Sequence, residues 1–280
     1  DATARLWDLS SGNTRRIIQH RDAVDSVQFS PLKGLLATGS GDGTIQLWST
    51  SQLRQIKTIT SEQLAIRNLQ FNPDGTQLAS AGADSTIKLW TVPLGKEIRT
   101  YKGHLRPVRC LAFHPNGEEL ISASWDLTVK RWSLEPSPPV LGAHQHVVQD
   151  LDYSPDGKWL ATASYDQTIK LWQMPDRRLA HVFSSTKSPV KTVRFSHDGQ
   201  WLAAGTADGM LYLWDLQDRQ IKTRRLAHQQ QINQIAFTPD SRWIGSVSND
   251  GLVKLWNLTD DHPVAVLRDH QGPVNTIAFS

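Results

Sequence analysis

The sequence predicts an all-β protein, a seven-bladed β-propeller of four-stranded antiparallel blades. Three observations predict it. Tryptophan recurs every 40–42 residues, at Trp7, Trp48, Trp90, Trp132, Trp172, Trp214 and Trp256. An aspartate lies six residues before each of them, at Asp1, Asp42, Asp84, Asp126, Asp166, Asp208 and Asp250. Between these markers the chain reads as short strands and turns, without the apolar spacing of a helix.

One unit, residues 107–132, illustrates the pattern. "PVRCLAF" (107–113) alternates as a strand does, and "HPNG" (114–117) is a turn. "EELISAS" (118–124) reads as a buried strand, and "LTVKRW" (127–132) alternates again. A fourth, outer strand completes the blade.

Six complete blades can be laid out, at 24–59, 66–101, 108–141, 148–183, 190–225 and 232–267. The seventh would combine residues 274–280 with residues 1–20, so that both chain ends close one ring and leave no sheet edge exposed. The period leaves about 11 residues of that blade, its second strand, unaccounted for. We therefore expect an incomplete closing blade and a chain that is a portion of a longer protein.

Composition narrows the class of protein. Hydrophobic residues make up 39% of the 280 residues, and no apolar run approaches the length of a membrane span. The single cysteine, Cys110, excludes a disulfide framework and favours a reducing compartment, so we expect a cytoplasmic, monomeric propeller occupying 1–280. The net charge of +3 is only slightly basic, which argues against nucleic acid as the partner.

Four units carry the same set of four polar and aromatic residues: a histidine, a hydroxyl residue 18 positions later, then the aspartate and the tryptophan. The sets are His20, Thr38, Asp42 and Trp48; His104, Ser122, Asp126 and Trp132; His144, Thr162, Asp166 and Trp172; and His228, Ser246, Asp250 and Trp256. These sets and the period resemble the WD-repeat family of β-propellers over essentially the whole chain. The Trp-Asp pair that names that family remains at Trp7-Asp8 and Trp214-Asp215.

The resemblance implies a structural role for each set. In the family the aspartate holds the imidazole, the imidazole meets the hydroxyl, and the hydroxyl meets the indole. A Ser-His-Asp catalytic site would occur once, whereas this set recurs in four blades, so we predict no catalytic residue. We also predict no cofactor and no metal site. Two units depart from the pattern, with Glu62 at one histidine position and with Thr186 and Ala204 at the histidine and hydroxyl positions of another.

The family resemblance implies a non-catalytic interaction scaffold. The repeat "SPDGKWLATASYDQTIKLW" (154–172) resembles those of large bacterial signalling proteins, which predicts a sensor or recruitment module within such a protein. Two alternatives stay open. One is binding of an acidic non-protein ligand, a lipid headgroup or nucleic acid; the other, more remote, is a propeller enzyme.

The predicted partner site lies on the rim around the channel, where loops carry function. Trp125 and Tyr165 stand where other units place a small residue before the aspartate. Arg67, Arg109 and Lys191 open the first strands of their units. Trp125 either packs on a neighbouring loop or, with the other four, grips a protein or peptide that has an apolar anchor and acidic flanks.

Overall fold

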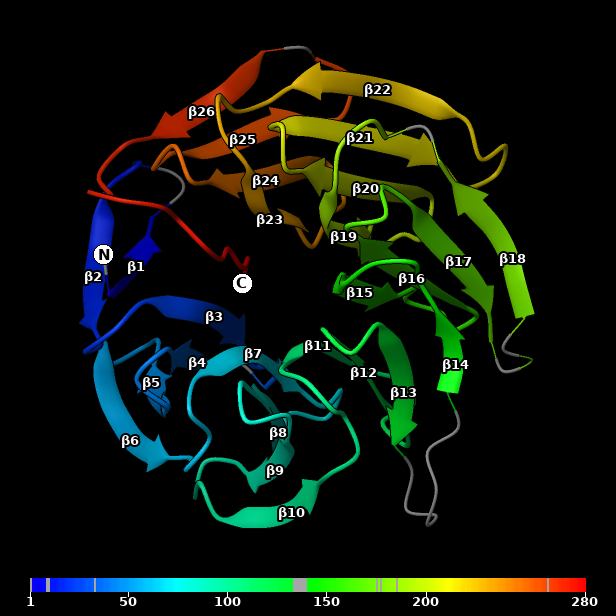
Figure 1. Ribbon diagram of the computed structural model, residues 1–280. Helices are drawn as coiled ribbons and strands as arrows, with labels where there is room; N and C mark the ends of the chain where they lie inside the picture. Colours follow the sequence, from blue (N-terminus) through cyan, green and yellow to red (C-terminus); the bar gives the residue numbers. More distant parts are fainter. Residues whose placement is uncertain are drawn as a thin grey trace.

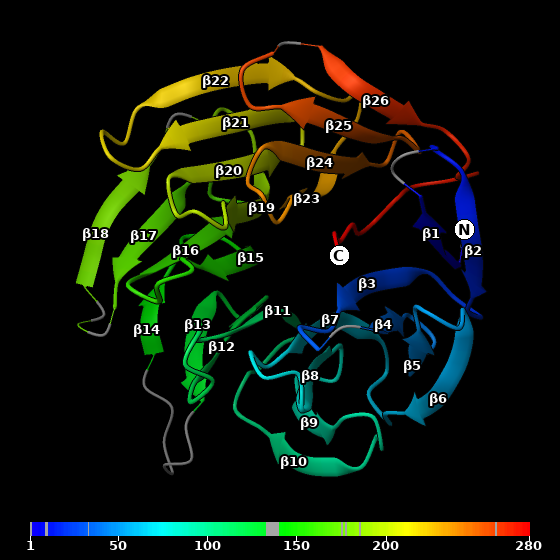
Figure 2. The ribbon, with the colours of Figure 1, turned by 180° about the vertical axis from the view of Figure 1, so that it is seen from behind.

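The computed structural model describes residues 2–8, 11–32, 34–132, 140–174, 176, 178–184, 186–260 and 262–280. Six four-stranded antiparallel sheets, the blades, stand around one axis (Figure 1). In each blade the strands run in chain order from the axis outward, and we call them a to d. Figure 2 shows the same ring from behind, with β10 and β22 on its circumference.

The strand bounds follow the repeat. Blade 1 is β3 (Val24–Phe29), β4 (Leu35–Ser40), β5 (Thr44–Ser49) and β6 (Arg54–Thr60); blade 2 is β7 (Ile66–Phe71), β8 (Gln77–Gly82), β9 (Ile87–Thr91) and β10 (Glu97–Tyr101); blade 3 is β11 (Val108–Phe113), β12 (Leu120–Ser124), β13 (Thr128–Trp132) and β14 (Val140–Ala143). Blade 4 is β15 (Val148–Tyr153), β16 (Trp159–Ser164), β17 (Ile169–Gln173) and β18 (Arg178–Phe183); blade 5 is β19 (Val190–Phe195), β20 (Trp201–Thr206), β21 (Met210–Asp215) and β22 (Ile221–Leu226); blade 6 is β23 (Ile232–Phe237), β24 (Trp243–Ser248), β25 (Val253–Asn257) and β26 (Pro263–Leu267).

The prediction of seven blades is wrong: the described residues form six. β1 (Thr3–Trp7) and β2 (Thr14–Gln19) form a sheet of two strands only. Residues 274–280 run towards the centre of the ring without joining a sheet, as the red segment of Figure 1 shows. The physical reason is that a ladder needs an adjacent strand, and no strand of the described residues lies between β1 and this segment. Val274 instead donates its backbone N–H to Ser248 O of blade 6, at 3.0 Å.

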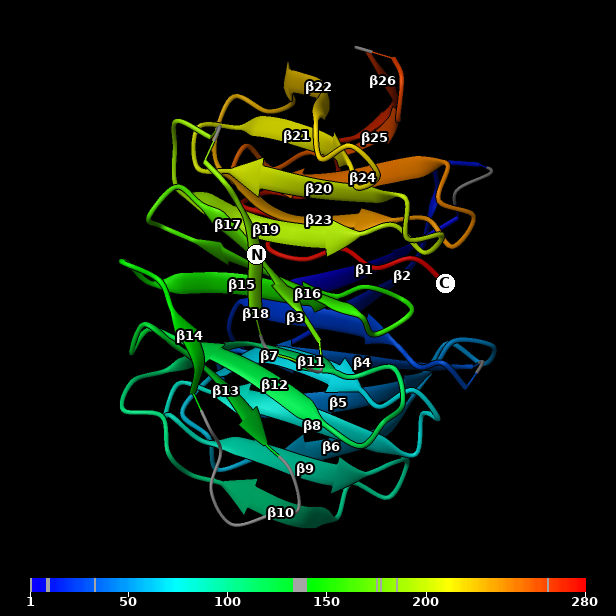
Figure 3. The ribbon, with the colours of Figure 1, turned by 90° about the vertical axis from the view of Figure 1, so that its right-hand side faces the viewer.

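Strand b of each blade is sandwiched between neighbouring blades, which explains its small residues. β20, with the sequence WLAAGT, is buried from its second residue to its last. A Cβ on Gly205 would lie 2.5 Å from Ile232 Cγ2 of the next blade. The blades therefore stack closely only where strand b carries Ala, Gly, Ser or Thr. Figure 3, a side view, shows the strands lying in successive layers.

Hydrogen bonds between residues 43 positions apart join strand a of one blade to strand a of the next, or, from blade 6, to the C-terminal segment. A side-chain oxygen accepts a backbone N–H in six pairs: Ser26 and Leu69, Asn68 and Leu111, Asp150 and Val193, Asp152 and Phe195, Thr192 and Ile235, Gln234 and Ile277. At the seam between blades 3 and 4 this position is Cys110, and the Leu151 N–H bonds Asp150 Oδ1 instead, at 3.0 Å. Polar residues on strand a thus fix the registry of the ring.

We expect Ser26→Ala to lower the free energy of unfolding by about 1–3 kcal/mol, because the buried Leu69 N–H would lose its acceptor, 2.9 Å away. Urea unfolding measures this loss. Ser51→Ala, at an exposed serine, is the control and should cost less than about 0.5 kcal/mol. Equal losses in the two variants would show that the bond between blades contributes no stability.

Candidate functional site

Three blades contain a complete chain of hydrogen bonds from the outer indole to the rim aspartate. In blade 3, Trp132 Nε1 donates to Ser122 Oγ at 2.7 Å, Ser122 lies 2.7 Å from His104 Nε2, and His104 Nδ1 lies 2.8 Å from Asp126. In blade 4 the successive bonds along the chain from Trp172 through Thr162 and His144 to Asp166 measure 3.0, 2.8 and 2.9 Å. In blade 6 those from Trp256 through Ser246 and His228 to Asp250 measure 2.8, 2.7 and 2.9 Å.

The electrostatics set the direction of each bond in blade 3. Although burial opposes ionisation, hydrogen bonds from the Thr128 hydroxyl, the Leu105 N–H and His104 lower the pKa of Asp126 to about 2. Burial lowers the pKa of His104, so the imidazole is neutral at pH 7. A neutral imidazole donates from Nδ1 to the carboxylate and accepts at Nε2 from the Ser122 hydroxyl. Ser122 is fully buried and both its bonds are used, so it has no freedom to attack a substrate.

The set in blade 1 is less complete. His20 Nε2 lies 2.8 Å from Thr38 Oγ1, but His20 Nδ1 is 3.8 Å from Asp42. Within the described residues, the buried Trp48 Nε1 has no hydrogen-bond partner. The four residues come together as the repeat predicts, but the chain of bonds is interrupted at both ends.

In blade 2 the residue at the histidine position is Gln63, not Glu62 as the spacing predicted. Ser80 Oγ donates to Gln63 Oε1 at 2.6 Å and accepts from Trp90 Nε1 at 2.9 Å. Glu62 has a φ of 60° and an exposed side chain, because the left-handed turn there points it outward. An amide therefore replaces the imidazole, and the loop is one residue shorter than in the other blades.

Aromatic packing replaces the polar chain in blade 5, where Ala204 removes the hydroxyl. Tyr212 stacks on Trp214, with centroids 5.5 Å apart and planes at 14°, and Phe183 of blade 4 lies 5.3 Å from Trp214. Thr186 donates to the carbonyl of Gln167 in blade 4. Blade 5 therefore lacks the polar set, and the rings of Tyr212 and Phe183 pack against Trp214 in its place.

The loops that join successive blades and the turns that join strands b and c lie on one face, which we call the rim face. The second residue of each strand a and Asn275 of the C-terminal segment form what we call the inner ring: Asp25, Arg67, Arg109, Gln149, Lys191, Asn233 and Asn275. Arg67 Nη1 lies 2.7 Å from Asp25 Oδ2, and Asn275 also donates to Asp25, at 3.2 Å. Arg67, a predicted partner-binding residue, is therefore held by a neighbouring carboxylate.

Two further predicted residues, Lys191 and Tyr165, contact each other. Lys191 Nζ donates to Tyr165 OH at 2.7 Å and to Gln149 Oε1 at 3.3 Å, and its residue is only 9% exposed. Burial, and then the positive charge of Arg109, lower the pKa of Lys191 to about 8. Tyr165 is half-buried and also lies against His146, with ring centroids 5.6 Å apart.

Trp125 is 41% exposed, so it is not buried under a neighbouring loop. Its backbone N–H bonds Pro107 O at 3.1 Å, which places the turn beside the loop that precedes strand a. Three leucines of the same face are also exposed: Leu64 (77%), Leu105 (87%) and Leu127 (39%). We call Leu64, Leu105, Trp125 and Leu127 the apolar rim patch.

Two of these leucines, Leu64 and Leu105, could have been found from the sequence by comparing the same position in each repeat. The residue after the histidine position of the four-residue set is polar in most units: Arg21, Gln145, Lys187 and Gln229. Leu105 follows His104, and Leu64 follows Gln63, so the two apolar exceptions fall on consecutive blades. Comparing equivalent positions across repeats would have revealed the patch, although the one-residue shift at Gln63 hides Leu64.

The comparisons with known proteins agree with this architecture. A family model described as "IFT122 first beta-propeller" matches residues 65–280, and one described as "WD domain, G-beta repeat" matches residues 12–49. The chain belongs to the WD-repeat β-propeller family. That part of the prediction is confirmed.

Two curated relatives of this WD-repeat propeller are each 35% identical to it over 63 residues, 21% of the chain. They are "Poly(A)+ RNA export protein" of Schizosaccharomyces pombe and "DENN domain and WD repeat-containing protein SCD1" of Arabidopsis thaliana. The match spans 18% of the first relative and 5% of the second. Both organisms are eukaryotes, so a bacterial style of repeat stays a prediction.

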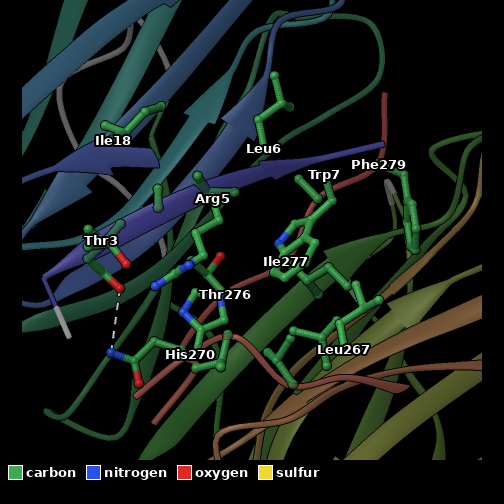
Figure 4. Close-up of a pocket in the computed structure, with 18 of the residues that line it drawn as sticks. Thr3, Arg5, Leu6, Trp7, Ile18, Leu267, His270, Thr276, Ile277 and Phe279 are labelled. Carbon is green, nitrogen blue, oxygen red and sulfur yellow. Dashed lines mark hydrogen bonds between the residues drawn. The ribbon is translucent and has the colours of Figure 1, made fainter. Parts of the chain in front are cut away.

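A cavity of about 150 Å³ lies beside the two-stranded sheet (Figure 4). Leu6 of β1, Ile18 of β2, Leu267 of blade 6, and Ile277 with Phe279 of the C-terminal segment line it. The cavity lies where the missing strand of the predicted seventh blade would have packed. Nowhere in the described part of the propeller do three His, Cys, Asp or Glu side chains cluster as metal ligands would. The described chain also contains no helix that could span a membrane.

A second cavity, of about 450 Å³, opens between blades 4 and 5 at the opposite end of the strands. Trp159 forms one wall, with the Arg219 guanidinium 5.8 Å from its ring centre. The carboxylates around it already have partners: Asp156 accepts from Ser154 at 2.7 Å, and Asp215 lies 3.6 Å from Lys222. The rim face, by contrast, keeps exposed apolar side chains and is the candidate interaction site of this propeller.

We expect Asp126→Asn to lower the free energy of unfolding at pH 7 by about 1–3 kcal/mol, since it removes a charged acceptor from His104 and the Leu105 N–H. The folded protein lowers the pKa of this carboxyl from 3.8 to about 2, so the stability it contributes is present above pH 4 and is lost as pH falls towards 2. Unfolding of both proteins in urea across this range should show the difference shrinking.

Asp208→Asn is the matched control, because Asp208 occupies the same turn in blade 5, where Thr186 replaces the histidine, and is exposed. It should change stability by less than about 0.5 kcal/mol. A loss at Asp208 as large as that at Asp126 would contradict the role given to the imidazole bond.

Proposed function

We propose that this WD-repeat propeller is a non-catalytic interaction module that binds a protein or peptide on its rim face, with the apolar rim patch as the anchor. The observation that carries the proposal is the exposure of four large apolar side chains on two adjacent blades. Exposed apolar groups that gather in one place are typical of binding surfaces, and tryptophan is enriched at their centres.

Backbone strain at Leu127 supports the same proposal. The third residue of this turn has a positive φ in every blade, and it is glycine in three: Gly43, Gly209 and Gly251. Leu127 adopts a φ of 73°, which costs a leucine about 1–2 kcal/mol, and its side chain stays 39% exposed. The fold gains little from a leucine there, so a role in binding accounts for it better than packing does.

The relatives support a module within a larger protein. The name of the Arabidopsis relative combines WD repeats with a DENN domain, and the name of the yeast relative describes an RNA export protein. From these names we carry over to this chain only one feature, that the propeller is joined to other domains. A sensor or recruitment role in signalling is part of the proposal.

We expect Trp125→Ala to weaken binding of the protein partner at least tenfold, a loss of about 1.4 kcal/mol or more, with the melting temperature almost unchanged. The partner would be identified by capture on the intact propeller and its Kd then measured by calorimetry. Leu226→Ala, at an exposed leucine on the outer strand β22, is the control and should bind normally. Normal binding by Trp125→Ala would mean that the tryptophan only packs locally.

We expect Leu127→Gly to move stability and binding in opposite directions. Glycine relieves the left-handed strain, so the free energy of unfolding should rise or stay level, to within about 1 kcal/mol. Loss of the exposed side chain should weaken the same partner several-fold. A variant that is destabilised and binds normally would show that Leu127 serves packing and not recognition.

A further inference from the structure

Arg109 is a cation on the inner ring whose charge is not matched by the protein. Its residue is half-buried, and in the described part of the chain its guanidinium has no ion pair and no hydrogen bond. Other arginines on strands a do have acidic partners. Arg67 lies 2.7 Å from Asp25, and Arg194 lies 2.6 Å from Asp150. Among the strand-a arginines of the described chain, only Arg109 therefore lacks an acidic partner.

Among the described residues Lys191 is a second cation with no carboxylate partner, and two hydrogen bonds fix its ammonium group. Its partners, Tyr165 OH and Gln149 Oε1, are both neutral. Gln149 lies on the blade between those of Arg109 and Lys191, so the three residues hold the second position of β11, β15 and β19 on consecutive blades. Two like charges held near each other raise the energy of the protein, and that energy falls when an anion binds between them.

The neighbouring polar groups present donors rather than acceptors. Gln149 Oε1 already accepts from Lys191, which leaves the two protons of its amide nitrogen without an acceptor among the described residues. The Tyr165 hydroxyl likewise accepts from Lys191 and keeps its own proton to donate. Guanidinium, ammonium, amide and hydroxyl donors are the groups that bind carboxylate and phosphate oxygens.

We propose that Arg109, Lys191, Gln149 and Tyr165 form an oxyanion site on the rim face, which receives a carboxylate or phosphoryl group of the protein partner. This inference rests on the proposed function. The site adjoins the apolar rim patch through blade 3, because the loop at 104–107 that carries Leu105 leads directly into β11 and Arg109. A partner residue anchored on Trp125 therefore places an acidic neighbour beside Arg109.

A protein partner fits this site better than nucleic acid does. Nucleic acid binding requires many cations along a track of phosphates, whereas the site has two, next to exposed leucines and a tryptophan. One or two acidic groups beside an apolar residue match that composition.

The test uses small anions as probes, with the whole propeller and at constant ionic strength. Inorganic phosphate and N-acetylaspartate are titrated separately while backbone amide shifts are recorded by NMR. We expect saturable shifts centred on residues 109, 149, 165 and 191. Arg109→Gln should weaken binding of the preferred probe at least fivefold, and Arg106→Gln, at an exposed arginine three residues away, should not. Saturation by only one probe assigns the group as phosphoryl or carboxylate.

Lys191→Met provides a second variant, and the urea midpoint of each variant verifies its fold. Unchanged probe affinity in folded Arg109→Gln and Lys191→Met would overturn the site, as would shifts spread evenly over all surface arginines. Tighter binding of a single-stranded oligonucleotide, with a steep dependence on salt, would overturn the choice of a protein partner.

Trp125→Ala separates this inference from the proposed function. It should keep phosphate and N-acetylaspartate affinity while losing the protein partner. If Trp125→Ala retains the partner but Arg109→Gln loses the probes, the apolar anchor is wrong and the oxyanion site stands. If Arg109→Gln binds the protein partner normally although it loses the probes, the site binds anions without serving that partner, and the inference fails.

Discussion

The buried hydroxyl on strand b is the group on which the rim of blades 3, 4 and 6 depends. Ser122 ties the indole of Trp132 on strand c to His104 in the loop before strand a, and His104 holds Asp126 in the turn. One chain of bonds therefore links the outer part of the blade to both segments of its rim. Because the members are buried, each lost bond leaves a polar group unsatisfied, and the loop and turn are held in one relative position. Leu105 and Trp125 flank His104 and Asp126, so the same bonds position the apolar rim patch.

Much of the fold follows from the sequence, because a 42-residue period repeats local information. The spacing of Trp and Asp, the turns and the alternating strands locate the six blades and the polar sets. The period could not decide the seventh blade, since a ladder depends on a strand being present and not on a matching period. Nor could it show that Gln63 replaces Glu62 at the histidine position, because that depends on a left-handed turn at Glu62.

The candidate site was predictable in kind but not in detail. Residue type indicated five candidates: Trp125, Tyr165, Arg67, Arg109 and Lys191. Which of these side chains can contact a partner depends on their own contacts with residues 26 or 42 positions away in the sequence. Asp25 neutralises Arg67, and the Tyr165 hydroxyl binds Lys191. Each contact crosses a seam between blades, where partner choice depends on side-chain reach around the ring. A sequence read one repeat at a time does not contain that information.

The contrast between Arg67 and Arg109 shows how a repetitive scaffold acquires a specific surface. The two residues occupy equivalent positions on adjacent blades, so their backbone environment is the same. The residue one blade earlier decides their state: Asp25 precedes Arg67, whereas Arg67 itself precedes Arg109. A carboxylate one position round the ring neutralises the first arginine, and a cation there cannot neutralise the second. Substitution at a single position of the inner ring thus changes the charge available at its neighbour without altering the blade. The sets of His, Ser or Thr, Asp and Trp and the small residues of strand b hold the fold independently of that ring.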